Sequence, residues 1–237
     1  MKAIVTSIMA IALLLGSCQA KSEPIEVTAG ELHASNDKLT EVMVHDNVSP
    51  PVASRVYAYP NIAAYEIMSL HNEAYRSLRG QVSDLEGIPE PAPDQQVNYR
   101  LAALIAHMDL GRRLIFSEDR ITVFRDSLYG VWEEQNPDEF ETAKEYGLEV
   151  AEFIAGWMAG DNYNQTRTMS KFTVDTEDPS RWQPTPPSYM EGIEPHWNKI
   201  RPFVIDSANQ FIPQPAPPRG RAGRGGGLKI KKGGCDI

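Results

Sequence analysis

The sequence has 237 residues, of which 41% are hydrophobic and 23% are charged, and its formal net charge is −9. Residues 217–237 carry a charge of +5, so the rest of the chain carries −14. An acidic body argues against nucleic acid as a partner, because phosphate binding needs a basic face. The two cysteines, Cys18 and Cys235, lie near the ends, so we expect no disulfide framework in the folded region.

Residues 1–17 are predicted to be an export signal that is removed. A basic start precedes an apolar run over residues 3–15, which is too short to span a bilayer comfortably. The motif Leu15-Gly16-Ser17-Cys18 resembles a bacterial lipobox, which implies that Cys18 becomes the acylated first residue of a membrane-anchored lipoprotein. Gln19 after that cysteine implies the outer membrane of a Gram-negative bacterium. The alternative is an ordinary secretory signal with an incidental cysteine.

Residues 18–34 are polar without a sustained period, and we predict that they tether the fold to the membrane. A first helix is expected to begin at Ser35 or Asn36, because either side chain suits an N-cap. Its apolar positions recur at helical spacing, at Leu39, Val42 and Met43. Pro50 is expected to end this helix.

A second helix is predicted from Pro51 to about Leu70. Between Val52 and Met68 the residues that are neither apolar nor aromatic, apart from Pro60, are Ser54, Arg55, Asn61 and Glu66. A helix that is apolar on nearly every side must be packed from several directions. We therefore expect a partner segment that this chain does not encode, and exposed apolar surface that favours self-association in its absence. Pro60 should kink the helix, and one face should carry Arg55, Tyr59, Ile62 and Glu66.

Three further helices are predicted after a loop over Gly80–Pro93. The first covers Asp94–Ser117, and Ser117 then begins the second. Asn136-Pro137 closes that helix and starts the third, which runs to about Gly160. Five helices with no clear strand indicate an all-α protein, with a helical bundle over residues 35–175 whose neighbouring helices are antiparallel.

Residues 176–218 contain ten of the eighteen prolines of the chain, together with several aromatic residues. Disordered linkers are usually poor in aromatic residues, so we predict an ordered strap that lies against the bundle. The strap's tryptophans, Trp182 and Trp197, either anchor it to the core or stack on a sugar or another aromatic ligand. Residues 219–237 are rich in glycine and basic residues and are expected to be disordered, as a flexible tail or as a frame-shifted end.

Three stretches carry a resemblance to a known family: SPPVASRVYAYPNIAAYE at 49–66, LIFSE at 114–118 and WQPTPPSYMEGIEPHWNKIRPF at 182–203. With them, residues 39–218 resemble the N-terminal part of bacterial lipoproteins of the vanadium-dependent haloperoxidase group, which belongs to the type 2 phosphatidic acid phosphatase superfamily. The resemblance implies that a complete member uses vanadate and peroxide to oxidise halide, or hydrolyses phosphate esters. It also implies that this chain supplies a helical scaffold.

The family's oxyanion site is built from three signatures: a Lys followed after six residues by Arg-Pro, a Ser-Gly-His, and a Ser-Arg followed five residues later by His. Arg201-Pro202 supplies an Arg-Pro, but Glu194 stands at the position of the Lys. Ser-Gly-His does not occur, and Ser54-Arg55 leads to Asn61 in place of His. We therefore assign no catalytic, vanadate-binding or metal-binding residue, and we expect this chain to be inactive by itself.

Other polar residues are interpreted as structural. The five histidines are His33, His45, His71, His107 and His196. His45 with Asp46, and His107 with Asp109, cannot chelate a metal as pairs, because such neighbours point to different sides of a helix. The carboxylates at Glu118, Asp119, Asp126, Glu133 and Glu134 accompany Arg112, Arg113, Arg120 and Arg125. This mixture is typical of a solvated charged face. The competing interpretation of the whole chain is a complete non-catalytic outer-membrane lipoprotein that binds a carbohydrate or protein partner through its strap.

Overall fold

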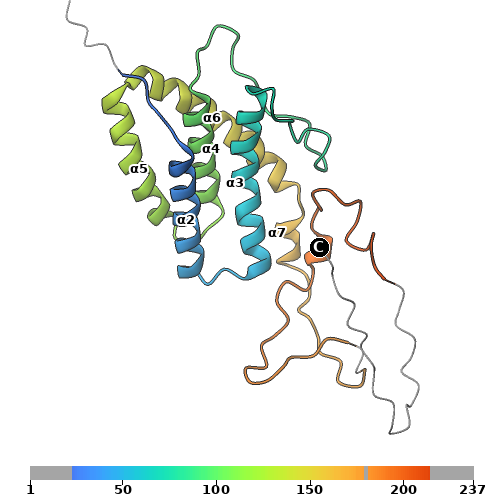
Figure 1. Ribbon diagram of the computed structural model, residues 1–237. Coiled ribbons are helices and arrows are strands. Elements are labelled where there is room, and N and C mark those ends of the chain that lie inside the picture. The colour runs from blue at the N-terminus through green and yellow to red at the C-terminus, as the bar shows by residue number, and fades with distance from the viewer. Residues whose placement is uncertain (1–22, 179–180, 214–237) are drawn as a thin grey trace, which may run out of the picture.

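The computed structural model describes residues 23–178 and 181–213, and over that part of the chain the fold is all-α, as predicted (Figure 1). Five long helices pack as a bundle and are followed by one short helix and a single 3-10 turn. The elements are α2 (Ala29–His45), α3 (Pro50–Leu70), α4 (Tyr99–Arg113), α5 (Glu118–Gln135), α6 (Pro137–Ala159), α7 (Tyr163–Thr166) and η1 (Trp197–Lys199). No described helix is both long and apolar enough to cross a bilayer.

The first helix begins earlier than the sequence pattern suggested. Thr28 caps α2, and Glu31 completes a capping box by accepting a hydrogen bond from the Thr28 backbone N–H. Ser35, one of the two predicted caps, is buried inside the helix. Ile25 and Val27, before the helix, are also buried. The prediction of a tether over residues 18–34 is therefore wrong in its later part, because residues from Ile25 onward belong to the fold.

Helix α3 is enclosed by other parts of the same chain. Over the whole helix only Pro50 and Ser54 are exposed, and Tyr59 and Ile67 are almost completely buried. Helices α4 and α6 pack against it, and the α2 side chains around Leu39 form a second apolar cluster with Val56. The expectation that this helix needs a partner segment from outside the chain is therefore wrong. The large apolar side chains that are exposed to solvent lie outside α3, and most of them follow α7.

Helix α4 forms the centre of the bundle. Every residue from Leu101 to Gly111 is buried, and the helix contacts α2, α3, α5 and α6. It begins at Tyr99 with Asn98 as its cap, five residues later than predicted, because residues 94–98 belong to the preceding loop. Gly147 of α6 lies so close that a β-carbon there would be 2.6 Å from the Ala102 carbonyl oxygen. The two most central helices thus meet at a position where only glycine fits without movement.

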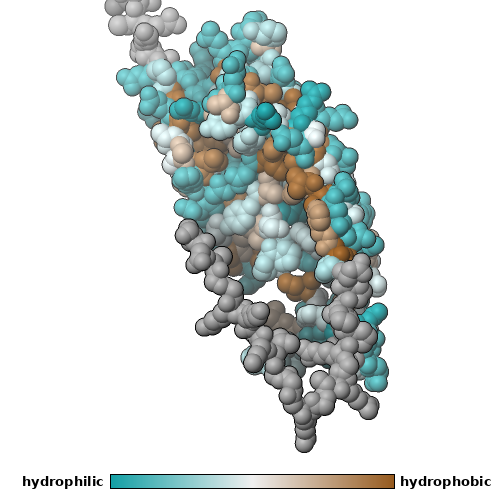
Figure 2. Space-filling model, turned by 45° about the vertical axis from the view of Figure 1, so that its right-hand side comes forward, coloured by the Kyte–Doolittle hydropathy of each residue, from teal (hydrophilic) through white to brown (hydrophobic). Residues whose placement is uncertain are grey.

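The loops and the strap complete the molecule. Residues between α3 and α4 fold back on the bundle, and Val82 and Leu85 there belong to the main core. Beyond α7 the described chain extends from the end of the bundle where α7 lies, away from the start of α2 (Figure 1). The face of the molecule shown in Figure 2 mixes hydrophilic and hydrophobic residues over the bundle. Most of the described strap residues are exposed.

Candidate functional site

A buried polar junction joins α3, the end of α6, α7 and the strap. Asp161, which follows α6, is only 1% exposed. Its Oδ2 accepts hydrogen bonds from Arg55 Nε at 2.6 Å and from the Tyr59 hydroxyl at 2.8 Å. Its Oδ1 accepts from the Tyr163 backbone N–H at 2.8 Å, and its backbone carbonyl accepts from the Arg201 N–H at 2.9 Å. Asp161 therefore joins α3, the end of α6, α7 and the strap, through its carboxylate and its backbone carbonyl together.

Aromatic rings surround this junction. The Arg55 guanidinium carbon lies 5.1 Å from the centre of the Tyr59 ring and 4.3 Å from that of Tyr163. Tyr59 also meets Trp157 and Phe203 edge-on, at 5.2 and 5.5 Å between ring centres. Burial, and then the charge of Asp161, raises the pKa of the Tyr59 hydroxyl well above its usual value. Tyr59 is therefore a hydrogen-bond donor at neutral pH and not a base.

A pocket of about 340 Å³ opens beside the junction, between α3 and the strap. Ser54-Arg55 and Arg201-Pro202, the two partial matches to the family's oxyanion signatures, both line it. The structure thus brings together two partial matches that lie far apart in the sequence. Its other lining residues are Tyr59, Asp161, Trp197, Asn198, Ile200, Phe203, Ile205 and Ala208.

This pocket does not fit an oxyanion such as vanadate. Arg55 is paired with Asp161, and Arg201 Nη2 donates to the Trp157 carbonyl at 2.9 Å. The described lining includes neither lysine nor histidine, and the buried carboxylate would repel an anion. Arg55 thus fixes α3 to the turn after α6, and Arg201 fixes the strap to the end of α6.

The residues at the positions of the missing Lys and His also have structural partners. Glu194 accepts hydrogen bonds from both Nη atoms of Arg167. Asn61 donates from its amide to Asn36 Oδ1 at 2.9 Å, which links α3 to α2. Neither residue lines the pocket beside Asp161.

The histidines are dispersed. His107 is fully buried, and its Nδ1 lies 2.9 Å from the Ser35 hydroxyl, while its Nε2 has no hydrogen-bond partner among the described residues. Burial lowers the pKa of His107 to about 4. His71 stacks on Tyr99, His196 Nε2 lies 2.7 Å from the Ser170 carbonyl, and His33 and His45 are exposed. In residues 23–178 and 181–213, no three His, Cys, Asp or Glu side chains gather where they could hold a metal ion.

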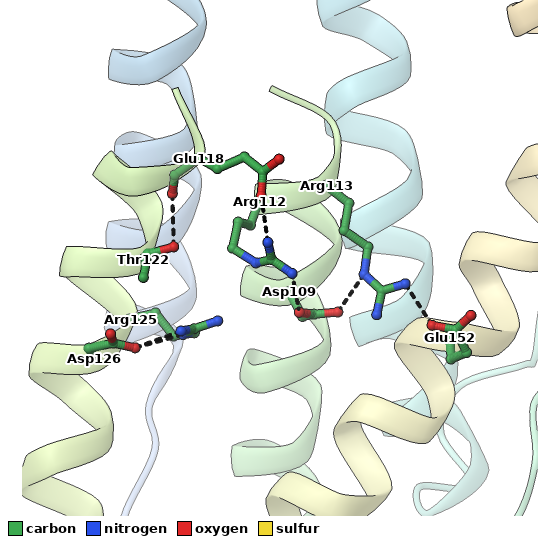
Figure 3. Close-up of polar contacts among 8 residues, drawn as sticks. All are labelled: Asp109, Arg112, Arg113, Glu118, Thr122, Arg125, Asp126 and Glu152. Atoms are coloured by element: carbon green, nitrogen blue, oxygen red, sulfur yellow. Dashed lines mark hydrogen bonds and ion pairs between the residues drawn. The ribbon is translucent and has the colours of Figure 1, made fainter. Parts of the chain in front are cut away.

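Part of the predicted charged face forms a set of ion pairs on α4, α5 and α6 (Figure 3). Asp109 is nearly buried and accepts hydrogen bonds from Arg112 Nη2 and Arg113 Nε, at 3.3 and 2.8 Å. The two arginines also reach outward, to Glu118 of α5 at 2.5 Å and to Glu152 of α6 at 2.7 Å. These partners neutralise the carboxylates, so no pair of them is free for acid-base catalysis in this network.

The two strap tryptophans have different environments. Trp197 is partly buried and meets Tyr163 edge-on, which agrees with an anchoring role. Trp182 is 49% exposed and packs on Phe172, at 5.5 Å between ring centres. Phe172 and Trp182 line an open cavity of about 560 Å³ with the strap residues Thr185, Pro186, Pro187, Ser188, Met190, Glu191, Gly192, Ile193 and Pro195. Trp182 is therefore not a core anchor in this structure.

No protein-family model and no curated protein matches the chain. Among solved structures, the chain is similar to a bacterial vanadium-dependent iodoperoxidase, with 62% sequence identity and a TM-score of 0.81. The match covers 85% of this chain and 48% of the solved chain. This chain therefore spans about half the length of that relative. The predicted resemblance to the bacterial vanadium-dependent haloperoxidases is confirmed, and the coverage is consistent with an N-terminal portion of such a protein.

Proposed function

We propose that this chain is the N-terminal helical scaffold portion of a vanadium-dependent haloperoxidase-like lipoprotein, related to the acid phosphatases, and that it has no turnover by itself. The observation that carries the proposal is the match at 62% identity over only 48% of the solved relative. The whole relative is named for iodoperoxidase activity, whereas this chain supplies part of its length.

The proposed inactivity follows from the residues that are present. An oxyanion in a dry site needs several cationic or amide donors, and the family's chemistry also needs a histidine. Here Arg55 and Arg201 are engaged with Asp161 and Trp157, and Asn61 is engaged with Asn36. A vanadate ion would have to displace the buried Asp161 carboxylate in order to use the Arg55 Nε–H. We therefore assign vanadate to complete members of the family and no cofactor to this chain.

We also propose that Cys18 is the lipid-attachment residue and that the protein is anchored in the outer membrane. Cys18 lies outside the described residues, so the support comes from the lipobox-like Leu15-Gly16-Ser17-Cys18. Each buried methylene contributes about 0.8 kcal/mol, so several acyl chains would hold the protein stably in a bilayer. Mass spectrometry of the purified N-terminus tests this, and an unmodified Cys18 would refute it.

The test of the proposed function is a halogenation assay of the purified chain with vanadate, peroxide and iodide or bromide. The solved iodoperoxidase, assayed under the same conditions, is the positive control. We expect the chain to give no halogenation above the rate with vanadate and peroxide alone. Sustained turnover that depends on the chain would overturn the proposal.

The exposed cavity beside Trp182 favours a second candidate, a non-catalytic lipoprotein that binds a carbohydrate or protein partner. Phe172 and Trp182 supply aromatic faces of the kind on which sugar rings stack. In that case the chain should be a monomer that unfolds in one cooperative transition. Thermal melting with size-exclusion chromatography distinguishes the two candidates, because a scaffold whose exposed apolar strap residues are covered in the whole relative should associate when it is alone.

A further inference from the structure

The beginning of the described chain is fixed to one end of the bundle. The Ile25 backbone N–H donates to Glu139 Oε2 at 3.0 Å, and the Ile25 carbonyl accepts from Asn98 Nδ2 at 2.7 Å. Gln135 Nε2 donates to the Pro24 carbonyl at 2.9 Å. The Ile25 side chain is 3% exposed and belongs to the main core. Residues 24–25 are thus held by the start of α4, the end of α5 and the start of α6.

This attachment limits the distance between the fold and a lipid on Cys18. An extended chain spans at most about 3.6 Å per residue, so the five steps from Cys18 to Glu23 reach about 18 Å. A flexible tether over residues 18–34 would reach roughly 58 Å. The limit depends only on chain length, whatever conformation the intervening residues adopt. The anchored protein is therefore held close to the bilayer by one defined end.

We propose that this end of the bundle, formed by the start of α4, the end of α5 and the start of α6, faces the lipid surface, and that the strap and its exposed aromatic residues project away from the membrane. The inference rests on the proposed lipid anchor at Cys18. Helix α2 begins directly after the fixed segment, and its 17 residues rise about 25 Å along its axis. The far end of α2, the turn to α3 and the strap thus lie on the distal side (Figure 1).

The charge of this end of the bundle decides whether it inserts into the bilayer or stays beside it. Glu23, Glu26, Glu133, Glu134 and Asp138 are all exposed near the fixed segment. Such an acidic end is repelled by anionic lipid, and the repulsion reaches about 10 Å at 0.1 M salt. The end should therefore stand beside the membrane at a distance set by the chain from Cys18 to Glu23, without inserting into it.

Energy transfer from a dye on the protein to an acceptor lipid tests the orientation. The full lipidated chain, with Cys235→Ser to remove the second thiol, is placed in phosphatidylcholine vesicles that contain the acceptor. One variant carries the dye at Glu134→Cys, beside the fixed segment, and the matched control carries it at Val44→Cys. Both positions are exposed, and Val44 lies about 22 Å along α2 from its first residue.

We expect clearly greater transfer from the dye at position 134 than from the dye at position 44. Insertion of ten Gly and Ser residues between Ser22 and Glu23 should lower the transfer at position 134 without changing the circular dichroism spectrum. Equal transfer from both dyes, or no effect of the insertion, in protein that mass spectrometry shows to be lipidated would overturn the orientation alone. An unmodified Cys18 would instead overturn the lipid anchor, and this inference with it.

Discussion

Arg55 and Asp161 are 106 residues apart in the sequence and form an ion pair of 2.6 Å whose side chains are 9% and 2% exposed. The pair joins α3 to the turn after α6, and the Asp161 carbonyl also holds the backbone of Arg201. A contact between such distant residues explains why the strap returns to α3. It also pairs the Arg55 guanidinium, one of the two that line the pocket, with a carboxylate.

Removal of one partner of this pair should destabilise the protein strongly. Arg55→Met leaves a buried carboxylate without its cation, and such changes cost about 3–5 kcal/mol. The measurement is the free energy of unfolding from urea titration at neutral pH. The control is Lys144→Met, which breaks an exposed pair with Glu141 and should cost less than about 1 kcal/mol. Similar losses in the two variants would show that the buried pair is not a principal contact.

The close packing of α4 against α6 predicts that alanine substitutions at two glycines of α6 change the stability in opposite directions. In Gly147→Ala the new methyl group meets the Ala102 carbonyl oxygen at 2.6 Å, so the helices must move apart, at a cost of about 1–3 kcal/mol. In Gly156→Ala the methyl group meets nothing within 4 Å, and the higher helix propensity of alanine should stabilise by up to about 1 kcal/mol. Thermal melting measures both. A stable Gly147→Ala protein would contradict the described packing.

Acid should weaken the fold through His107. Burial lowers its pKa from 6.5 to about 4 in the folded protein, so between these values only the unfolded chain takes up the proton. The free energy of unfolding therefore has its full value above pH 6.5, falls as the pH drops toward 4, and loses about 3 kcal/mol from this group in all. His107→Gln should have a flatter pH dependence over this window.

Urea titrations at several pH values measure that dependence. The matched control is His33→Gln, the same substitution at an exposed histidine. If His107→Gln kept the full slope between pH 6.5 and 4, other groups would be responsible for the acid sensitivity.

Phe203 should be a main contact that holds the strap on the bundle. It packs edge-on to Tyr59, and its carbonyl accepts hydrogen bonds from the backbone N–H and hydroxyl of Ser83. Phe203→Ala removes the ring but not the bundle core, so we expect cleavage of the strap by a protease to become several-fold faster while the melting temperature changes little. Phe211→Ala, which removes a side chain that is 79% exposed, is the control and should leave the cleavage rate as it is. Equal rates in both variants would argue against docking through Phe203.

The parts of the fold that local patterns determine could be predicted from the sequence. Ser117 and Asn136-Pro137 lie at the start of α5 and α6 as expected, because caps and prolines act within one turn of a helix. The start of α2 was predictable too, since Thr28 and Glu31 have the spacing of a capping box. The polar composition of residues 18–34 masks this start, because it resembles that of a tether.

Contacts between distant residues could not be predicted in the same way. The residues on either side of Asp161 form no recognisable motif. Asp161 has a structural role because it pairs with Arg55, which lies on another helix. The apolar character of α3 correctly indicated packing on several sides. A single sequence does not say whether the covering residues come from the same chain, and here α2, α4, α6 and the strap supply them.

Vanadate binding by the purified chain is the most direct test of the proposal that this portion is a scaffold without an oxyanion site. The free vanadate signal is followed by vanadium NMR while the chain is added, with the solved iodoperoxidase as the positive control. We predict that the chain leaves the signal unchanged, whereas the relative removes it in a saturable way. Saturable loss of the signal with one equivalent of this chain would contradict the proposal.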